Sequence, residues 1–336
     1  MNGTSAGRSM AVAIGALALT AMLAAGHRWA TRHQLGAVAP SLRSPLLPAV
    51  SVPFTSRTLP GQRMMFAVPR WSGPKVSVST RRDEATGLRM RVTRPSGGGG
   101  LRPAVVWLHC GGMVAGSPHF GGPTIGSLAR AVDAVVVAPY YRLAPEHRYP
   151  AALDDVMTTL SWIAKHAVQL GVDPGRIAVA GASAGGGLAA VGAQRCRDEG
   201  VALRAQALLY PMLDDRTALR PAPEAPVWGP ASNRFAWTSY LGAPPDPAAA
   251  PPYAAAARAA DLSGLAPAWL GVGERDLLYE ETCRYADALN RSGTACELVV
   301  VPGMYHAADL LVPWARPMRA LHTDLAAHLR HHLTVQ

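Results

Sequence analysis

Cysteine is scarce in this chain of 336 residues. Its four cysteines form no C-x-x-C pair and no dense framework; they are Cys110, Cys196, Cys283 and Cys296. Zinc sites and disulfide scaffolds both depend on such spacings. The sequence therefore predicts no metal site and free thiols, with a Cys283–Cys296 bond left open if the protein is exported.

Lysine is scarcer still, at Lys75 and Lys165 alone, and charged residues make up only 16% of the chain. The net charge of +10 comes from arginines that are scattered along the sequence. Nucleic-acid-binding proteins cluster basic side chains on one face, where they neutralise phosphates. The dispersal argues against a nucleic-acid partner.

One apolar run stands apart at the N-terminus, within residues 10–26, with positive charge on both flanks. It is long for the core of a signal peptide and short for a membrane span. We expect residues 1–32 to be a membrane-targeting segment, either a signal peptide cleaved after Gly26 or an uncleaved anchor. The alternative is a misassigned start codon, with Met22 or a later residue as the true beginning, and that leaves a cytoplasmic protein.

From residue 76 onward, short apolar runs alternate with segments compatible with helices. The expected strands are 76–80, 88–93, 104–108, 134–138, 177–180, 205–209, 268–272 and 296–301, the first two antiparallel at a sheet edge. The expected helices are 125–132, 151–166, 186–197, 279–290 and 317–331. Continuous apolar runs suit strands covered on both faces, and their alternation with helices indicates a mostly parallel sheet. One elaborated α/β domain over residues 33–336 accounts for the length.

Two stretches break this alternation. Residues 33–70 are rich in Pro, Arg and Ser without a sustained period, which predicts an irregular or partly helical arm. Residues 216–261 carry many prolines, several aromatic residues and no strand signal. The second stretch is too long for an ordinary connection, so we expect a cap or lid there. Its aromatic side chains are equally suited to lining a pocket and to anchoring the insertion.

The strongest motif is at residues 181–185, which read G-A-S-A-G, an instance of G-x-S-x-G. It follows the expected strand 177–180 directly and precedes a helix of small residues. Such a strand-to-helix turn exposes the serine hydroxyl, and its glycines avoid collisions with neighbouring backbone. Ser183 is therefore the candidate nucleophile.

Three further segments give a family resemblance. Residues 109–112 read H-C-G-G, residues 140–146 read Y-Y-R-L-A-P-E, and residues 149–152 read Y-P-A-A. With G-A-S-A-G-G at 181–186, they occur in the order typical of hormone-sensitive-lipase-like bacterial esterases, which this chain resembles from about residue 104 to 190. The resemblance implies an α/β-hydrolase fold, with a mostly parallel central sheet flanked by helices and a cap built from an N-terminal arm and an insertion.

The resemblance also implies that the backbone amides of Gly111, Gly112 and Ala184 form an oxyanion hole. Acyl-transfer enzymes need such donors aimed at the tetrahedral intermediate. Two positions depart from the family's motifs, since Cys110 replaces a glycine and Ala182 replaces the usual aspartate. If position 110 required a positive φ, the cysteine would alter the path of the loop.

The candidate base is His306, which follows the expected strand 296–301 and is the last histidine before the C-terminal helix. The chain order of serine, acid and histidine is that of α/β-hydrolases. The family's H-G-F reads H-A-A here. The remaining histidines of the C-terminal helix, at 322, 328, 331 and 332, are interpreted as solvated.

The candidate acid is Asp276, which follows the expected strand 268–272 in a segment that resembles the family's D-P-L. Its role is to hold the imidazole tautomer and to stabilise the imidazolium. Asp214 and Asp215 follow the preceding strand and are rival candidates.

These residues predict a serine carboxylesterase that works through an acyl-enzyme, with no metal or organic cofactor. The family resemblance implies that its substrates are short- to medium-chain acyl esters. The substrate partner is a small-molecule ester. An alternative is a hydrolase of amides, carbamates or acetylated sugars with the same triad. A small-ligand-binding protein without activity is a further alternative, which the presence of His306 argues against. The sequence leaves the oligomeric state open.

Overall fold

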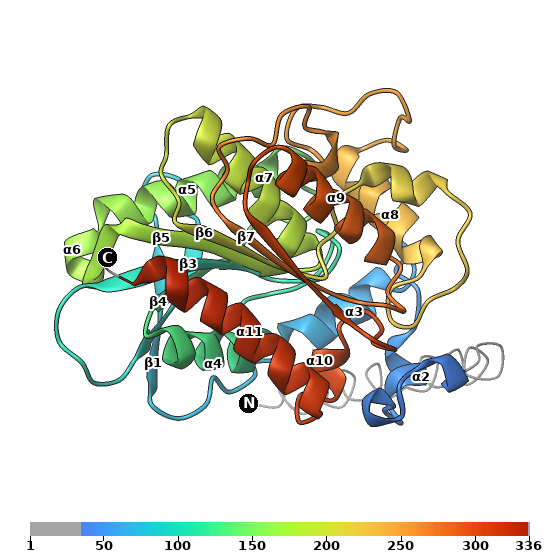
Figure 1. Cartoon of the computed structure of the whole chain (residues 1–336), viewed down its shortest axis with the longest axis horizontal. Helices are drawn as coiled ribbons and strands as arrows, with labels where there is room; N and C mark the ends of the chain where they lie inside the picture. The colour runs from blue at the N-terminus through green and yellow to red at the C-terminus, as the bar shows by residue number, and fades with distance from the viewer. Residues whose placement is uncertain (1–34, 335–336) are drawn as a thin grey trace, which may run out of the picture.

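The computed structural model describes residues 35–334, and within them eight strands form one sheet (Figure 1). The strands are β1 Val76–Arg82, β2 Arg89–Pro95, β3 Arg102–Leu108, β4 Val135–Pro139, β5 Val172–Ala182, β6 Ala205–Leu209, β7 Ala268–Gly273 and β8 Cys296–Val301. Their order is β1-β2-β4-β3-β5-β6-β7-β8. β1, β2 and β4 pair antiparallel, and all other neighbours are parallel. The predicted mostly parallel sheet with an antiparallel edge is confirmed.

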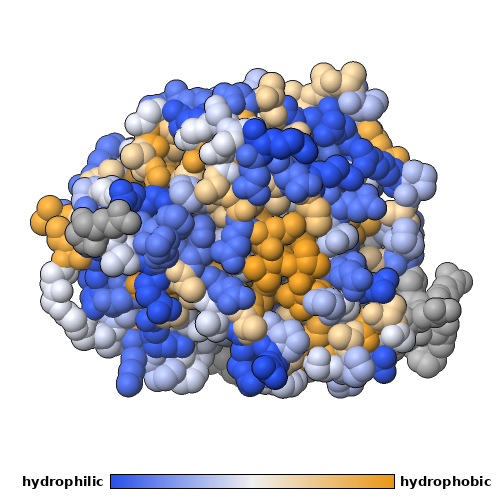
Figure 2. All heavy atoms as spheres, viewed as in Figure 1, coloured by the Kyte–Doolittle hydropathy of each residue, from blue (hydrophilic) through white to orange (hydrophobic). Residues whose placement is uncertain are grey.

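Continuous apolar sequence explains the central strands, because every residue of β3, β4, β6 and β7 is buried. β5 begins earlier than the sequence predicts, at Val172, which pairs with Arg102. Residues 173–176 at its start read D-P-G-R, which lacks the apolar pattern of a strand and conceals this extension. At the other edge, β8 is less covered than the central strands, and its Val300 is 36% exposed. Hydrophobic residues gather near the middle of the face shown in Figure 2.

Helices cover both faces of the sheet (Figure 1). α5 Ala151–Lys165, α7 Ala184–Asp198 and α9 Tyr279–Arg291 bury apolar side chains in one core. α4 Gly122–Val132 and α11 Arg316–Leu333 do so on the opposite face. The five predicted helices are therefore present, and short helices α6 Ala167–Leu170 and α10 Ala308–Leu311 supplement them.

The two stretches outside the alternation fold into short helices that meet each other. The N-terminal arm contains η1 Leu35–Ala37, η2 Pro40–Leu42, α2 Leu47–Val50 and α3 Leu59–Ala67, and residues 216–261 contain α8 Pro230–Leu241 and η4 Ala256–Arg258, after η3 Asp215–Leu219. The amide of Phe54 donates to the Ser232 hydroxyl over 3.0 Å, and the amide of Val227 donates to the Ser51 hydroxyl over 3.1 Å. Each stretch thus supplies partners for the other's backbone.

The expected membrane-targeting segment, residues 1–32, lies outside the described residues. Between residues 35 and 334, no helix combines the length and the apolar character needed to cross a membrane. All four cysteines lie in the described part and are free thiols.

Candidate active site

Ser183 is held in a strained turn between β5 and α7. Its φ of 57° and ψ of −122° lie outside the regions that L-residues prefer. The glycines on either side are sterically required: a Cβ on Gly181 would lie 2.3 Å from the Gly185 carbonyl oxygen, and one on Gly185 would lie 2.1 Å from that of Leu108. The turn therefore has the tight form that the G-x-S-x-G pattern predicts.

His306 and Asp276 reach Ser183 from the loops that follow β8 and β7. His306 Nε2 lies 2.9 Å from Ser183 Oγ, and His306 Nδ1 lies 2.7 Å from Asp276 Oδ2. The other oxygen of Asp276 accepts the Leu278 amide over 2.9 Å. All three side chains are buried, so the structure brings the predicted nucleophile, base and acid together in one hydrogen-bonded chain.

The rival acids, Asp214 and Asp215, form ion pairs with arginine side chains. Asp214 binds the guanidinium of Arg216, with 2.8 Å between Nε and Oδ1, and Asp215 binds Arg258 over 2.7 Å. Neither hydrogen-bonds to the imidazole of His306, whose Nδ1 is 2.7 Å from Asp276. The geometry favours Asp276 over both.

The glycine-rich loop at residues 109–112 lies beside the triad, since Cys110 and Gly111 line one cavity together with Ser183 and His306. Gly111 and Gly112 have φ values of 125° and 63°, whereas Cys110 is absent from the positive-φ residues. The cysteine is therefore compatible with the path of the loop. No hydrogen bond within residues 35–334 uses the amides of Gly111 or Gly112, and the Ala184 amide belongs to the first turn of α7, where amides lack an intrahelical partner.

The side chains of Cys110 and His109 in this loop are electrically neutral. Burial raises the pKa of the Cys110 thiol to about 12, so this thiol, which lines the same cavity as Ser183, is not a thiolate nucleophile at neutral pH. Burial also lowers the pKa of His109 to about 4, although a hydrogen bond to the Cys110 carbonyl opposes the shift. The His109 ring stacks on Tyr141, with centroids 4.0 Å apart, which fixes the base of the loop.

An apolar cavity of about 120 Å³ opens on Ser183 and His306. Its walls include Phe54 and Phe66 of the N-terminal arm, Phe120, and Trp228 of the insertion. Trp228 also packs on Phe54, with ring centroids 5.5 Å apart, so it both lines the cavity and joins the two stretches. Trp237 and Tyr240 of the same insertion are buried and are not among the lining residues.

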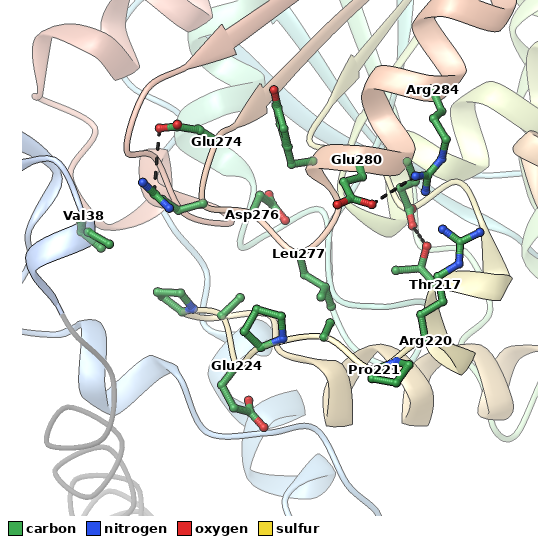
Figure 3. Close-up of a pocket in the computed structure, with 18 residues that line it drawn as sticks. Val38, Thr217, Arg220, Pro221, Glu224, Glu274, Asp276, Leu277, Glu280 and Arg284 are labelled. Atoms are coloured by element: carbon green, nitrogen blue, oxygen red, sulfur yellow. Dashed lines mark hydrogen bonds and ion pairs between the residues drawn. The ribbon is translucent and has the colours of Figure 1, made fainter.

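A larger, more polar cavity of about 580 Å³ lies on the other side of Asp276 (Figure 3). Its lining carries Glu274, Glu280 and Arg284, but neither Ser183 nor His306. The larger of these two cavities is therefore not the one that contains the predicted nucleophile and base. Among the described residues, no group of three or more His, Cys, Asp or Glu side chains is placed to hold a metal ion.

One interpretation of the sequence is wrong. His322 and His328 are not solvated helix residues: His322 Nε2 lies 2.9 Å from Asp309 Oδ2 with its side chain 31% exposed, and the Nε2 of His328 is buried. The other Asp309 oxygen accepts the hydroxyl of Tyr210 over 2.8 Å. Neither Asp309 nor Tyr210 belongs to a motif identified in the sequence, and only the fold shows that Tyr210 lies against His306 and binds Asp309.

The sequence profile of the family described as alpha/beta hydrolase fold matches residues 105–310. The chain belongs to this family. It is 38% identical to "Carboxylesterase NlhH" of Mycobacterium tuberculosis over 230 residues, which cover 67% of this chain and 72% of that one. It is 39% identical to "Esterase LipI" of the same species over 219 residues, covering 62% and 64% of the two chains.

Solved structures of the alpha/beta hydrolase family agree with this assignment. A structure named "Bacterial Heroin Esterase" superimposes with a TM-score of 0.80 at 31% identity, covering 90% of this chain and 99% of that one. The hormone-sensitive-lipase-like resemblance and the α/β-hydrolase fold are thereby confirmed.

Proposed function

We propose that this protein is a serine carboxylesterase that hydrolyses small esters through Ser183, His306 and Asp276. The observation that carries the proposal is the buried chain of hydrogen bonds from serine to imidazole to carboxylate, with distances of 2.9 and 2.7 Å, at the wall of an apolar cavity. The similarity to a carboxylesterase and an esterase supports the same reaction class.

In the proposed mechanism, His306 Nε2 accepts the Ser183 proton as Oγ attacks the ester carbonyl. Asp276 holds Nδ1 protonated, so that Nε2 is free to accept, and stabilises the imidazolium that forms. His306 then donates its proton to the departing alcohol, leaving an acyl-enzyme. Water, deprotonated by His306, attacks the acyl carbon and releases the acid, and the proton returns to Ser183.

The oxyanion of each tetrahedral intermediate is assigned to the amides of Gly111, Gly112 and Ala184. This assignment is supported by the free amides of the two glycines and by the position of Ala184 at the first turn of α7. The positive end of the helix dipole favours negative charge at this point. Preorganised donors of this kind supply much of the rate acceleration in acyl transfer.

The acyl group is proposed to occupy the 120 Å³ cavity under a cap made of residues 35–70 and 216–261. Ligand pockets usually measure about 300–1,000 Å³, so this one is small. Its walls are mostly apolar, which suits the hydrocarbon part of an acyl group. We therefore propose short acyl chains as the preferred substrates within the short- to medium-chain range.

Residues 1–32 are proposed to direct the protein to a membrane or out of the cell. The apolar run at residues 10–26 supports this proposal. Fractionation of producing cells, followed by mass analysis of the purified chain, tests it: an intact chain in the soluble cytoplasmic fraction contradicts it.

The central test is hydrolysis of p-nitrophenyl esters from acetate to palmitate. We expect activity on the short esters that Ser183→Ala abolishes, whereas Ser161→Ala on the exposed face of α5 leaves it unchanged. Paired ester and amide substrates of the same acyl group decide between an esterase and an amidase. A folded protein that hydrolyses no ester in the series contradicts the proposal.

A further inference from the structure

A second buried carboxylate lies behind His306, and the triad does not include it. Asp309, in α10, is 4% exposed. Its Oδ1 accepts the hydroxyl of Tyr210 over 2.8 Å, and its Oδ2 lies 2.9 Å from Nε2 of His322 in α11. Both carboxylate oxygens therefore have a partner, and the two partners come from different elements of the fold.

Tyr210 connects this carboxylate to the reaction centre. Its ring meets the imidazole of His306 edge-on, with centroids 4.8 Å apart and an interplanar angle of 63°. Tyr210 directly follows Leu209, whose carbonyl accepts the Ser183 amide over 2.9 Å. The aromatic ring thus stands between Asp309 and the imidazole, at the end of the strand that also supports the nucleophile.

The backbone of Tyr210 is strained, with a φ of 37°. A non-glycine residue keeps such a conformation only where its surroundings hold it. Two contacts do so: the amide donates to the Gly271 carbonyl over 2.6 Å, and the hydroxyl donates to Asp309. Without the hydrogen bond to Asp309, the Tyr210 ring is less firmly held against His306.

The charge on Asp309 strengthens this arrangement. Burial alone would raise the pKa of the carboxyl, but the hydrogen bond and charge of His322, together with the Tyr210 hydroxyl, hold the pKa below its usual value. The carboxylate is therefore ionised at neutral pH. Hydrogen bonds to an ionised acceptor are about twice as strong as neutral ones.

We propose that Asp309 is a positioning residue for the base, acting through Tyr210 to fix the rotamer of His306. The inference rests on the proposed function, since it concerns the same site. Asp309 follows His306 by three residues and lies in the first turn of α10, which continues directly from the loop that carries His306. Anchoring that loop to Tyr210 on one side and to His322 on the other stops the imidazole from turning away from Ser183.

The test compares Tyr210→Phe, which keeps the ring and removes only the hydroxyl, with Asp309→Ala and with the double variant. Asp324→Asn on the exposed face of α11 is the control. We expect kcat for p-nitrophenyl butyrate to fall roughly tenfold in each single variant, with KM changed less than twofold, because misplacement of a catalytic group acts on the chemical step. Asp309→Asn, which can still accept the hydroxyl, should recover part of the loss.

The double variant separates this role from general stabilisation. If both residues act through one contact, the double variant loses no more activity than Asp309→Ala alone. Losses that multiply, or an unchanged kcat in variants that remain folded at the assay temperature, overturn the inference.

A second readout does not depend on ester turnover. The proton on His306 Nδ1, bound to Asp276, should give a downfield NMR signal in the wild-type protein that is broadened in Tyr210→Phe. An unchanged signal overturns the positioning role. A wild-type protein that shows this signal but hydrolyses no ester contradicts the proposed function and leaves the positioning of His306 measurable.

Discussion

Glu281 of α9 is a buried carboxylate that joins α9 to the start of the insertion. Its Oε1 accepts the amide of Leu213 over 2.7 Å, and its Oε2 accepts the hydroxyl of Thr217. Burial raises the pKa of Glu281 to about 8, although these hydrogen bonds oppose the shift. We predict that Glu281→Gln makes the protein more stable at alkaline pH.

The sign follows from proton binding. Between the usual value of 4.5 and about 8, folded Glu281 keeps a proton that the unfolded chain has released. The native state binds more protons there, so the stability contributed by this group falls as the pH rises through this interval. At about 1.36 kcal/mol per pH unit, the stability lost across this interval is at most about 5 kcal/mol. Glutamine does not ionise, so the variant does not lose this stability as the pH rises.

The measurement is urea unfolding of wild-type protein and Glu281→Gln at pH 5, 7 and 9. Glutamine keeps an oxygen for the Leu213 amide and an NH₂ group that can donate to the Thr217 hydroxyl, so little else changes. The free-energy advantage of the variant should grow with pH. Glu280→Gln, whose side chain is 77% exposed and pairs with Arg284, is the control and should show no such growth. If the unfolding free energies of wild type and Glu281→Gln changed in parallel from pH 5 to 9, the argument would be refuted.

Three further predictions concern the site itself. Asp276→Asn should lower kcat about 10⁴-fold by favouring the wrong imidazole tautomer, and a loss under tenfold in ester assays would point to another acid. Phe66→Ala should enlarge the acyl cavity and raise kcat/KM for octanoate relative to butyrate roughly tenfold, and an unchanged ratio would place the acyl chain elsewhere. Ala307→Gly should relieve a φ of 56° and stabilise the protein by about 0.5–1 kcal/mol, measured as a higher Tm, and a lower Tm would contradict this.

The sequence predicted those parts of the molecule that depend on local pattern. Covered strands such as Ala205–Leu209 are continuous apolar runs, and the turn at Ser183 needs its glycines whatever else surrounds it. The order of the three triad candidates then placed His306 and Asp276 after late strands. These signals are carried by neighbours in the chain, so they can be read without knowing the fold.

The cap helices were harder to predict because tertiary packing stabilises them. α8 begins at Pro230 in a segment rich in proline, and its sequence lacks a clear apolar stripe. Its stability depends on partners far away in the chain, such as the Phe54 amide that Ser232 accepts. Trp228 likewise could be assigned neither to the pocket nor to the scaffold from sequence, and the structure gives it both contacts.

Backbone strain is concentrated around the proposed catalytic residues, so activity should be lost before the fold is. Ser183, Tyr210 and Ala307 all have positive φ, and they stand after β5, β6 and β8 at the same edge of the sheet. Each conformation costs of order 1–3 kcal/mol and persists only because buried neighbours impose it. Loosening those neighbours relaxes the strained residues first. The triad distances should therefore be lost before the sheet unfolds, and esterase activity should fall at lower urea concentration than the circular dichroism of the helices.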